Sequence, residues 1–159
     1  GLSLPEENVE IFRKQMNENC PFRAEEMVQT IHIDVPMPVD YVTNALVEEF
    51  SILAPFGKDN PKPVFADRNL KISRMWVIGK NQNVLRMTLV SEQGRPLSAI
   101  YFGDIEAMRT YLVEQYGIQE VEKAFHGREN NMQISIVYSP KLNTYKDSET
   151  LQFEIQYYR

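Results

Sequence analysis

Cysteine, histidine and long apolar runs are all scarce in this sequence of 159 residues. The one cysteine, Cys20, has no second cysteine with which to form an internal disulfide, which fits a reducing compartment. Two histidines, His32 and His126, are too few and too far apart in sequence for a histidine-rich catalytic or zinc centre. No apolar run approaches the ~18 residues that cross a bilayer, and no basic and apolar leader opens the chain. We therefore expect a cytoplasmic protein with no membrane partner.

The sequence has the composition of a globular protein and an uneven distribution of charge. Hydrophobic residues make up 43% and charged residues 25%, and the length fits one domain. The net charge is -5, yet residues 58–102 carry eight basic and three acidic side chains, whereas residues 1–57 carry three basic and ten acidic ones. A basic stretch indicates a polyanion partner, but exposed strand faces also carry Lys and Arg. Because the whole chain is acidic, charge alone favours the interpretation that these Lys and Arg side chains lie on a solvated strand face.

The first third of the chain shows mainly helical periodicity. Ser3 and Glu6 have the spacing of a capping box, which predicts the start of a helix. His32 points away from the apolar side of a predicted strand, so we interpret it as a surface residue and not as a metal ligand. The expected elements are a helix from the capping box to residue 19, a helical turn at 23–27, a strand at 30–35 and a helix at 39–53.

A Pro- and Gly-rich turn lies at residues 54–64. After it, apolar and polar residues alternate with a period of two, so we place a domain boundary between residues 57 and 58. Three strands, helices and two strands follow, which predicts an α+β fold with an OB-fold-like five-stranded antiparallel β-barrel, preceded by a small helical and strand segment. The basic stretch lies on the first three strands, where OB-folds bind ligands, and this coincidence favours a nucleic-acid partner. The expected strands are 69–79, 84–90, 96–102, 132–138 and 150–158, with helices at 104–117 and 118–125.

Residues 53–65, LAPFGKDNPKPVF, resemble the LxPFGxGNPxPxF linker of the RecJ family of single-strand-specific DNA exonucleases. The similarity extends over nearly the whole chain. Asp59 departs from it, because the family has glycine there, and so does the long stretch 117–131. Further similar segments are residues 1–13, 33–34, 99–103, 143–146 and 150–152.

The resemblance implies that residues 1–57 are the tail of a DHH-associated domain plus a connecting helix, and that residues 58–159 are an OB-fold nucleic-acid-binding domain. It implies the single-stranded DNA-binding portion of a 5′-to-3′ exonuclease in DNA repair and recombination. In that family an Asp-His-His domain holds two divalent cations, Mn or Mg. The sequence contains no Asp-His-His. We therefore expect a C-terminal fragment that is inactive by itself, has no catalytic residue, metal ligand or cofactor, and partners with single-stranded DNA and the missing nuclease domains.

Single-strand binders combine basic side chains for phosphates with aromatic platforms for bases. Trp76 is a further candidate platform, but it lies on the same side of the predicted strand as Leu70 and Ile72, so we expect it in the barrel core. The alternative is an OB-fold that docks on a protein or acts as a scaffold, with little DNA affinity of its own. The candidate contacts are Lys58, Lys71, Arg74, Lys80, Arg86 and Lys146 for phosphates and Tyr101 and Tyr145 for bases.

Overall fold

The computed structural model of the chain describes residues 1–22, 30–145 and 148–159, apart from the side chains of Tyr145 and Ser148. The chain divides into two units, Gly1–Ile31 and His32–Arg159. In the first unit the 3-10 helix η1 (Glu6–Asn8) leads into α1 (Val9–Glu18), and no side chain caps either of them. The predicted capping box is therefore not formed, because the helical turns begin after Pro5. The turn predicted at 23–27 lies outside the described residues.

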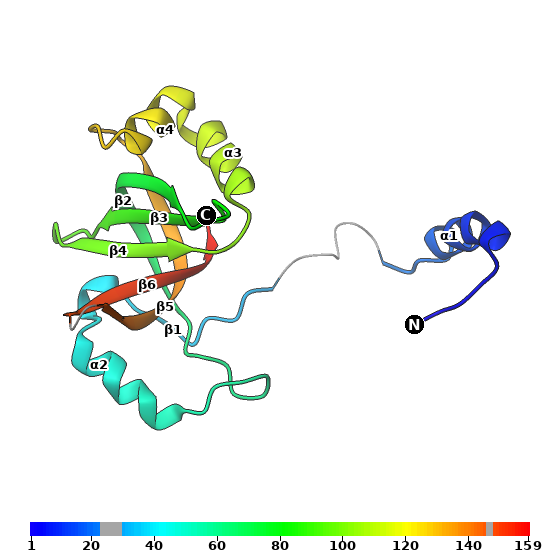
Figure 1. Cartoon of the computed structure of the whole chain (residues 1–159), viewed down its shortest axis with the longest axis horizontal. Helices are drawn as coiled ribbons and strands as arrows, with labels where there is room; N and C mark the ends of the chain where they lie inside the picture. Colours follow the sequence, from blue (N-terminus) through cyan, green and yellow to red (C-terminus); the bar gives the residue numbers. More distant parts are fainter. Residues whose placement is uncertain (23–29, 146–147) are drawn as a thin grey trace. The chain divides into compact units, whose positions relative to one another are not determined.

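Five strands of the second unit pair into a closed ring, in the order β2-β3-β4-β6-β5, with β5 returning to β2 (Figure 1). Two helices, α3 (Ile105–Tyr116) and α4 (Ile118–Phe125), lie between β4 and β5 in the chain. This arrangement confirms the expected α+β, OB-like fold. One pairing differs from the expectation, since β4 and β6 run parallel; the long connection through α3, α4 and β5 allows it. The ring strands are β2 (Phe65–Ile78), β3 (Val84–Val90), β4 (Pro96–Tyr101), β5 (Gln133–Tyr145) and β6 (Ser148–Tyr158).

Strand β5 is longer than the sequence pattern predicts, because it continues through Pro140. Proline removes a ladder donor and is tolerated where one side of a strand is unpaired. The pairing of β5 with β2 ends at Tyr138, so Pro140 lies where β5 pairs with β6 alone. The missing N–H therefore leaves no gap in the ladder between β5 and β2.

Residues 39–53 do not form the single helix that their apolar stripe predicts. They form η3 (Val39–Tyr41), α2 (Asn44–Glu49) and η4 (Phe50–Leu53). The break falls at Thr43, which has an extended backbone and whose Oγ1 accepts a hydrogen bond from Leu46 N at 3.2 Å. Thr43 is thus an N-cap, and a capping residue starts a new helix instead of continuing the previous one.

The segment before β2 packs onto the ring of strands. Its strand β1 (Val35–Pro36), shorter than the predicted strand at 30–35, pairs parallel with the start of β2. Val39 and Val42 are fully buried in the same hydrophobic core as the ring strands. The Tyr138 hydroxyl donates to the carbonyl of Met37 at 2.8 Å. The structural unit therefore begins at His32, before the boundary expected after residue 57.

Alternate residues of the strands fill the inside of the ring with apolar side chains. On β3 these are Leu85, Met87 and Leu89, all buried, while the residues between them are half-buried. Helices α3 and α4 add Met108, Leu112 and other buried residues to this core. Among the helices that the structure describes, none is long and apolar enough to cross a membrane. Because one set of alternate side chains packs into the core, the other set on β2, β3 and β4 points outward.

Candidate nucleic-acid interface

A β-bulge in β2 decides which of its side chains face away from the core. Ile72 pairs with Leu89 of β3, but the next pair joins Arg74 to Thr88, so Ser73 is an extra residue on β2. An extra residue reverses the alternation of the strand. Ile72 and, after the bulge, Met75 are both buried, which places Arg74 on the outside.

Trp76 lies on the outside of the ring as a result, and not in the core. Its indole is half-buried between two arginines. The Cζ atoms of Arg74 and Arg86 lie 5.4 Å and 5.6 Å from the centre of the ring. Both distances are within the ~6 Å of a cation–π contact. We call these three residues the Arg–Trp–Arg cluster; the expectation of a core Trp76 is wrong, because the bulge reverses the parity on which it relied.

Strands β3 and β4 continue this outward surface. Trp76 pairs with Arg86 of β3, and Arg86 pairs with Ile100 of β4. The Arg86 Nη2 donates a hydrogen bond to Ser98 Oγ at 3.4 Å, which ties the cluster to β4. We define the outer face by the outward residues of these three strands, which are Lys71, Arg74, Trp76, Arg86, Thr88, Ser98 and Ile100.

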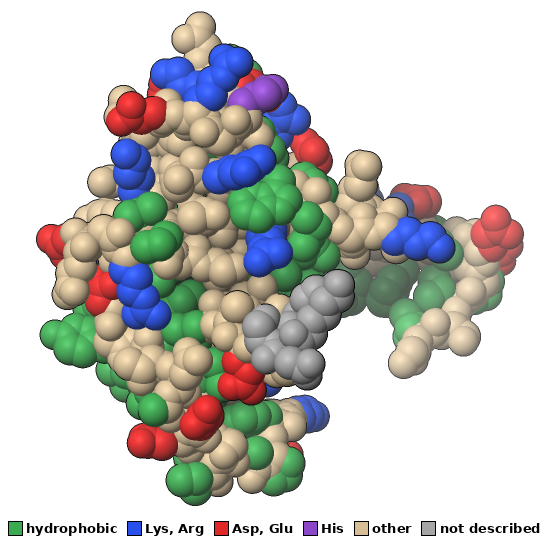
Figure 2. Space-filling view, turned by 60° about the vertical axis from the view of Figure 1, so that its left-hand side comes forward, with side chains coloured by type: hydrophobic (Ala, Val, Ile, Leu, Met, Phe, Trp, Pro, Cys, Tyr) green, Lys and Arg blue, Asp and Glu red, His purple; other side chains and the backbone are tan. Residues whose placement is uncertain are grey.

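The positive charge of the outer face has no internal counter-charge. Within the part of the chain that the structure describes, no ion pair involves Lys71, Arg74 or Arg86. The Nε of Arg86 is also buried with no hydrogen-bond partner among those residues. A buried donor without a partner costs about 1–3 kcal/mol. An anion at this surface would neutralise the charge, and Figure 2 shows Lys and Arg side chains next to hydrophobic ones on one face of the molecule.

A second exposed aromatic ring, Phe102, directly follows β4. Its side chain is 53% exposed. Lys141 of β5 lies over the ring, with Nζ 5.2 Å from its centre, and forms an ion pair with Glu154 at 2.8 Å. Unlike the Arg–Trp–Arg cluster, this end of the sheet is charge-balanced.

The remaining predicted contacts do not all join the outer face. Lys80 is exposed in the turn between β2 and β3. Lys58 is exposed in a separate turn, which is closed by hydrogen bonds between Gly57 and Asn60. The side chains of Tyr145 and Lys146 lie outside the described residues. The structure therefore brings together Lys71, Arg74 and Arg86 and leaves Lys58 on another loop.

Tyr101 is part of the core and offers no open ring to a base. It is 8% exposed and packs edge-on against Tyr158, with ring centres 5.6 Å apart. A Cβ built on Gly103 would lie 2.2 Å from the Tyr101 hydroxyl, so the chain folds closely over it. Burial and the nearby Tyr101 raise the pKa of Tyr158. Tyr101 is thereby removed from the candidate platforms.

Two exposed or half-buried aromatic residues differ from the expectation: Trp76, which strand alternation assigns to the core, and Phe102, which is not among the predicted contacts. A signal for Trp76 was present, because Arg74 stands two residues before it and alternation gives both residues one face. An arginine is almost never fully buried unless it is paired, so this face is a poor core. Phe102 gave no such signal, because it lies at the end of a strand whose other apolar residues are buried.

The described residues hold no group of three or more His, Cys, Asp or Glu side chains arranged to bind a metal ion. What they offer instead is cationic and aromatic: guanidinium groups, an indole and a hydroxyl on a rigid sheet. Such groups bind anions and planar rings without forming or breaking a covalent bond.

The closed ring, its helices and its basic, aromatic outer face define an OB-fold-like binding domain. The model of the RecJ OB domain family matches residues 33–157, and the chain belongs to this family. The match begins next to His32, where the second structural unit begins.

Proteins similar in sequence and in structure support this assignment. The single-stranded-DNA-specific exonuclease RecJ of Bacillus subtilis (strain 168) is 28% identical over 97 residues, which make up 60% of this chain and 12% of that protein. Crystal structures of RecJ from Thermus thermophilus with Mg²⁺ and with Mn²⁺ have the same fold, with TM-scores of 0.64 and 0.65 at 13% and 14% identity. They cover 99% and 100% of this chain, which spans only 21% and 20% of theirs.

Proposed function

We propose that this chain is the single-stranded DNA-binding portion of a RecJ-like 5′-to-3′ exonuclease that acts in DNA repair and recombination in the cytoplasm. The Arg–Trp–Arg cluster on the outer face is the observation that carries the proposal. It joins two cations, which have no carboxylate partner among the described residues, to an indole on a strand next to the usual ligand face of an OB-fold. The name of the Bacillus relative supports single-stranded DNA as the ligand.

In this proposal, phosphates and bases are bound by different parts of the cluster. Guanidinium groups bind phosphate oxygens in a bidentate manner, and Lys71 adds a point charge. Each guanidinium already lies over the indole, so a stacking base displaces one arginine, which then contacts a phosphate. Stacking accepts every base, so binding is tolerant of sequence. A duplex has no unstacked bases to offer and binds more weakly.

The cleavage step is proposed to take place elsewhere in the larger enzyme. The Thermus structures contain Mg²⁺ or Mn²⁺, and we propose a divalent cation for the whole enzyme. The residues described in this chain do not fit such a site, since no metal-ligand group is found among them. We propose that this chain presents the strand to nuclease domains of the same protein. Incubated alone with labelled single strands and Mn²⁺, it should release no nucleotides.

A titration of labelled single-stranded DNA at several salt concentrations tests the binding proposal. Each phosphate contact contributes ~0.7 to the slope of log K against log salt on single strands. Replacing Lys71, Arg74 and Arg86 together by Ala should therefore flatten the slope by about 2. A variant with Arg13, Lys14 and Lys62 replaced by Ala removes the same charge outside the outer face and should keep most of the slope. Equal slopes for all three proteins would overturn the proposal.

A protein-docking or scaffold role is the second candidate function. Large apolar side chains on the segment before β2 favour it, since Tyr41, Ile52 and Leu53 are 70%, 82% and 51% exposed. Large apolar side chains exposed to solvent favour contact with another protein. If DNA affinity is negligible at low salt, this function replaces the first.

A further inference from the structure

The loop that follows α4 lies against one arginine of the Arg–Trp–Arg cluster. Its central residue, Gly127, has a φ of +63°, and a Cβ built there would lie 3.3 Å from Nε and 3.4 Å from Cδ of Arg74. The backbone of the loop and the Arg74 side chain are therefore in close contact. A side chain at Gly127 would press on Arg74 and would strain the loop.

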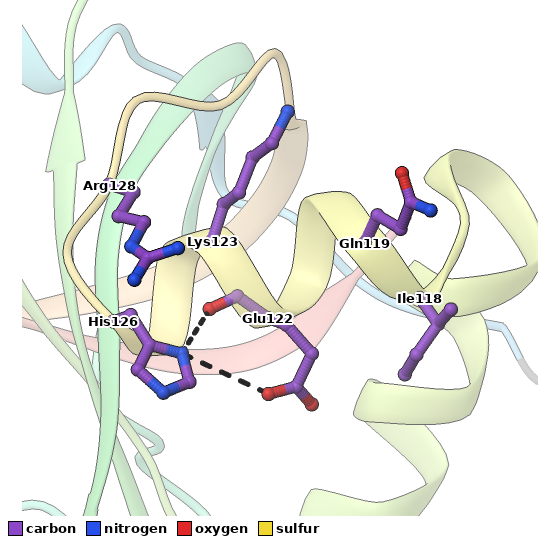
Figure 3. Close-up of a pocket in the computed structure, with 6 residues that line it drawn as sticks. All are labelled: Ile118, Gln119, Glu122, Lys123, His126 and Arg128. Carbon is purple, nitrogen blue, oxygen red and sulfur yellow. Dashed lines mark hydrogen bonds and ion pairs between the residues drawn. The ribbon is translucent and has the colours of Figure 1, made fainter.

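The same loop forms one side of a hollow in the surface (Figure 3). Its volume is about 380 Å³, within the range of ~300–1,000 Å³ typical of ligand pockets. His126 and Arg128 come from the loop, and the others come from α4. Basic and amide groups, one carboxylate and one apolar side chain thus surround a space beside the loop that contacts Arg74. The lining residues are Ile118, Gln119, Glu122, Lys123, His126 and Arg128.

The acidic residues of α4 are already paired within the protein. Glu122 forms an ion pair with Arg109 at 2.8 Å. Glu120 is hydrogen-bonded to Lys123 and to the backbone N–H of Asn131, and the pKa of Glu120 is lowered mainly by its bond to Lys123. These carboxylates are therefore neutralised locally.

Arg128 stands apart from these pairs. No carboxylate lies within ion-pair distance of its guanidinium among the described residues, although the exposed Glu129 follows it in the chain. Figure 2 shows Lys and Arg side chains gathered beside a histidine at the top of the view. The unpaired positive charge thus continues beyond the strands.

We propose that the loop 126–128 is a second phosphate-binding element, which extends the track for single-stranded DNA from the sheet onto the helical insertion. Arg128 contacts a backbone phosphate beyond those held by Arg74 and Arg86, and the hollow receives the adjoining nucleotide. The proposal rests on the proposed function. It gives a role to the stretch 117–131, which lies within the part of the chain that the RecJ OB domain model matches.

DNA strands of different length distinguish binding by this loop from binding by the sheet. OB-fold sites cover ~4–16 nucleotides. Arg128→Ala should weaken binding of an oligonucleotide of about 15 nucleotides and lower its salt slope by ~0.7, which corresponds to about fivefold in affinity at 0.1 M salt. Binding of a strand of about 5 nucleotides, held by the Arg–Trp–Arg cluster alone, should not change. Glu129→Gln should strengthen binding of the longer strand, because it removes the nearby negative charge.

Lys62→Ala is the matched control, since it removes one exposed positive charge on the turn before β2, far along the chain from α4. It should leave binding of both strands nearly unchanged. If Arg128→Ala behaves like Lys62→Ala while the triple variant of the outer face still loses its salt slope, the loop is not a binding element and the proposed function stands. If the unaltered chain binds neither strand, both proposals fail.

Discussion

Two cations held against one indole are the most informative residue-scale feature of this protein. Two like charges held against one ring repel each other, and each cation–π contact contributes only about 0.5–1 kcal/mol at an exposed site. The arrangement is therefore easily reorganised by a ligand that offers both negative charge and an aromatic surface. A nucleotide offers both.

Trp76→Ala is predicted to weaken binding of single-stranded DNA by about 1–3 kcal/mol, or roughly 5- to 150-fold, because it removes a stacking platform. Trp76→Phe should retain part of the affinity. Trp76 is the single tryptophan of the chain, so its fluorescence should change on titration with DNA and reports binding directly. Val77→Ala, at the neighbouring exposed position, is the control and should bind normally. Normal binding by Trp76→Ala would exclude the indole as a platform.

The sequence predicts the residues of the outer face only in part, and the reason is local. Charge density on strands is visible in sequence and predicts Arg74 and Arg86. Alternation assigns Trp76 to the core, because a bulge at Ser73 cannot be read from a pattern that assumes unbroken alternation. The sequence favours Tyr101 as an aromatic residue of a basic strand, and nothing in it shows that the ring packs against Tyr158.

At the scale of elements, β3, α3 and α4 follow the sequence pattern closely, whereas β2 and β5 are longer than it predicts. β3 has the expected bounds, 84–90, because its alternation is unbroken. α3 begins where Asp104 accepts from the N–H of Ala107 at 2.9 Å and ends at Gly117, whose φ is +84°. Residues 39–53 deviate, because the choice of Thr43 as an N-cap depends on burial of Val39 and Val42, which is a tertiary contact.

Deletion of Ser73 should leave the outer face in place, because the partners of Ile72 and Arg74, Leu89 and Thr88, are adjacent residues of β3. Without the extra residue, regular alternation keeps Ile72 inside and Arg74 outside. We therefore expect the deletion variant to unfold cooperatively and to bind DNA. Ser73→Ala keeps the strand length and should also bind normally. Circular dichroism melts with DNA titration of both variants measure this, and a deletion variant that folds but no longer binds DNA would contradict this account of the bulge.

Two tyrosines that border the core predict how stability depends on pH. Burial raises the pKa of Tyr138 and of Tyr158 above the ordinary value of 10. Below pH 10 both groups are protonated whether the chain is folded or unfolded, so their contribution is complete there. Above pH 10 the unfolded chain releases protons that the folded chain retains, and stability falls as the pH rises.

Tyr138→Phe should therefore reduce the loss of stability as the pH rises above about 10, measured as the shift of the urea midpoint. It also removes the hydrogen bond to the Met37 carbonyl, which should cost about 0.5–1.5 kcal/mol at neutral pH. Lysines titrate in the same range in both proteins, so the difference between the two pH profiles isolates Tyr138. Identical profiles would mean that the hydroxyl does not titrate differently in the folded and unfolded chains.

At the scale of the whole molecule, the sequence predicts the OB-like ring but not where the folding unit begins. The Pro- and Gly-rich turn at 54–64 is a conspicuous break in composition, and the boundary after residue 57 was placed there. In the structure the chain passes through this turn and remains attached to the same core on both sides. Asp67 of β2 accepts a hydrogen bond from Val39 N at 2.8 Å, and Asp34 accepts one from Val64 N at 2.8 Å. Such contacts join residues about thirty positions apart, and no local pattern encodes them.

Two truncations test this division of the chain. Removal of residues 1–31 should change the unfolding midpoint little, because no residue of α1 is buried and none of the described residues before His32 belongs to the core cluster. Removal of residues 1–57 should abolish the cooperative transition or lower its midpoint strongly.

The second truncation takes away Val39 and Val42, each 0% exposed, whose burial contributes roughly 3–6 kcal/mol together. It also removes the two carbonyls to which Arg95 Nη1 donates, at 3.4 Å and 3.2 Å. The free energy of unfolding of domains of this size is only about 5–15 kcal/mol, so this loss is comparable with the total stability of the domain. Urea unfolding of the intact chain, 32–159 and 58–159, followed by circular dichroism, measures it. A cooperative transition of 58–159 with the midpoint of the intact chain would show that the ring of strands is stable without the segment 32–57, and would restore the boundary that the composition indicates.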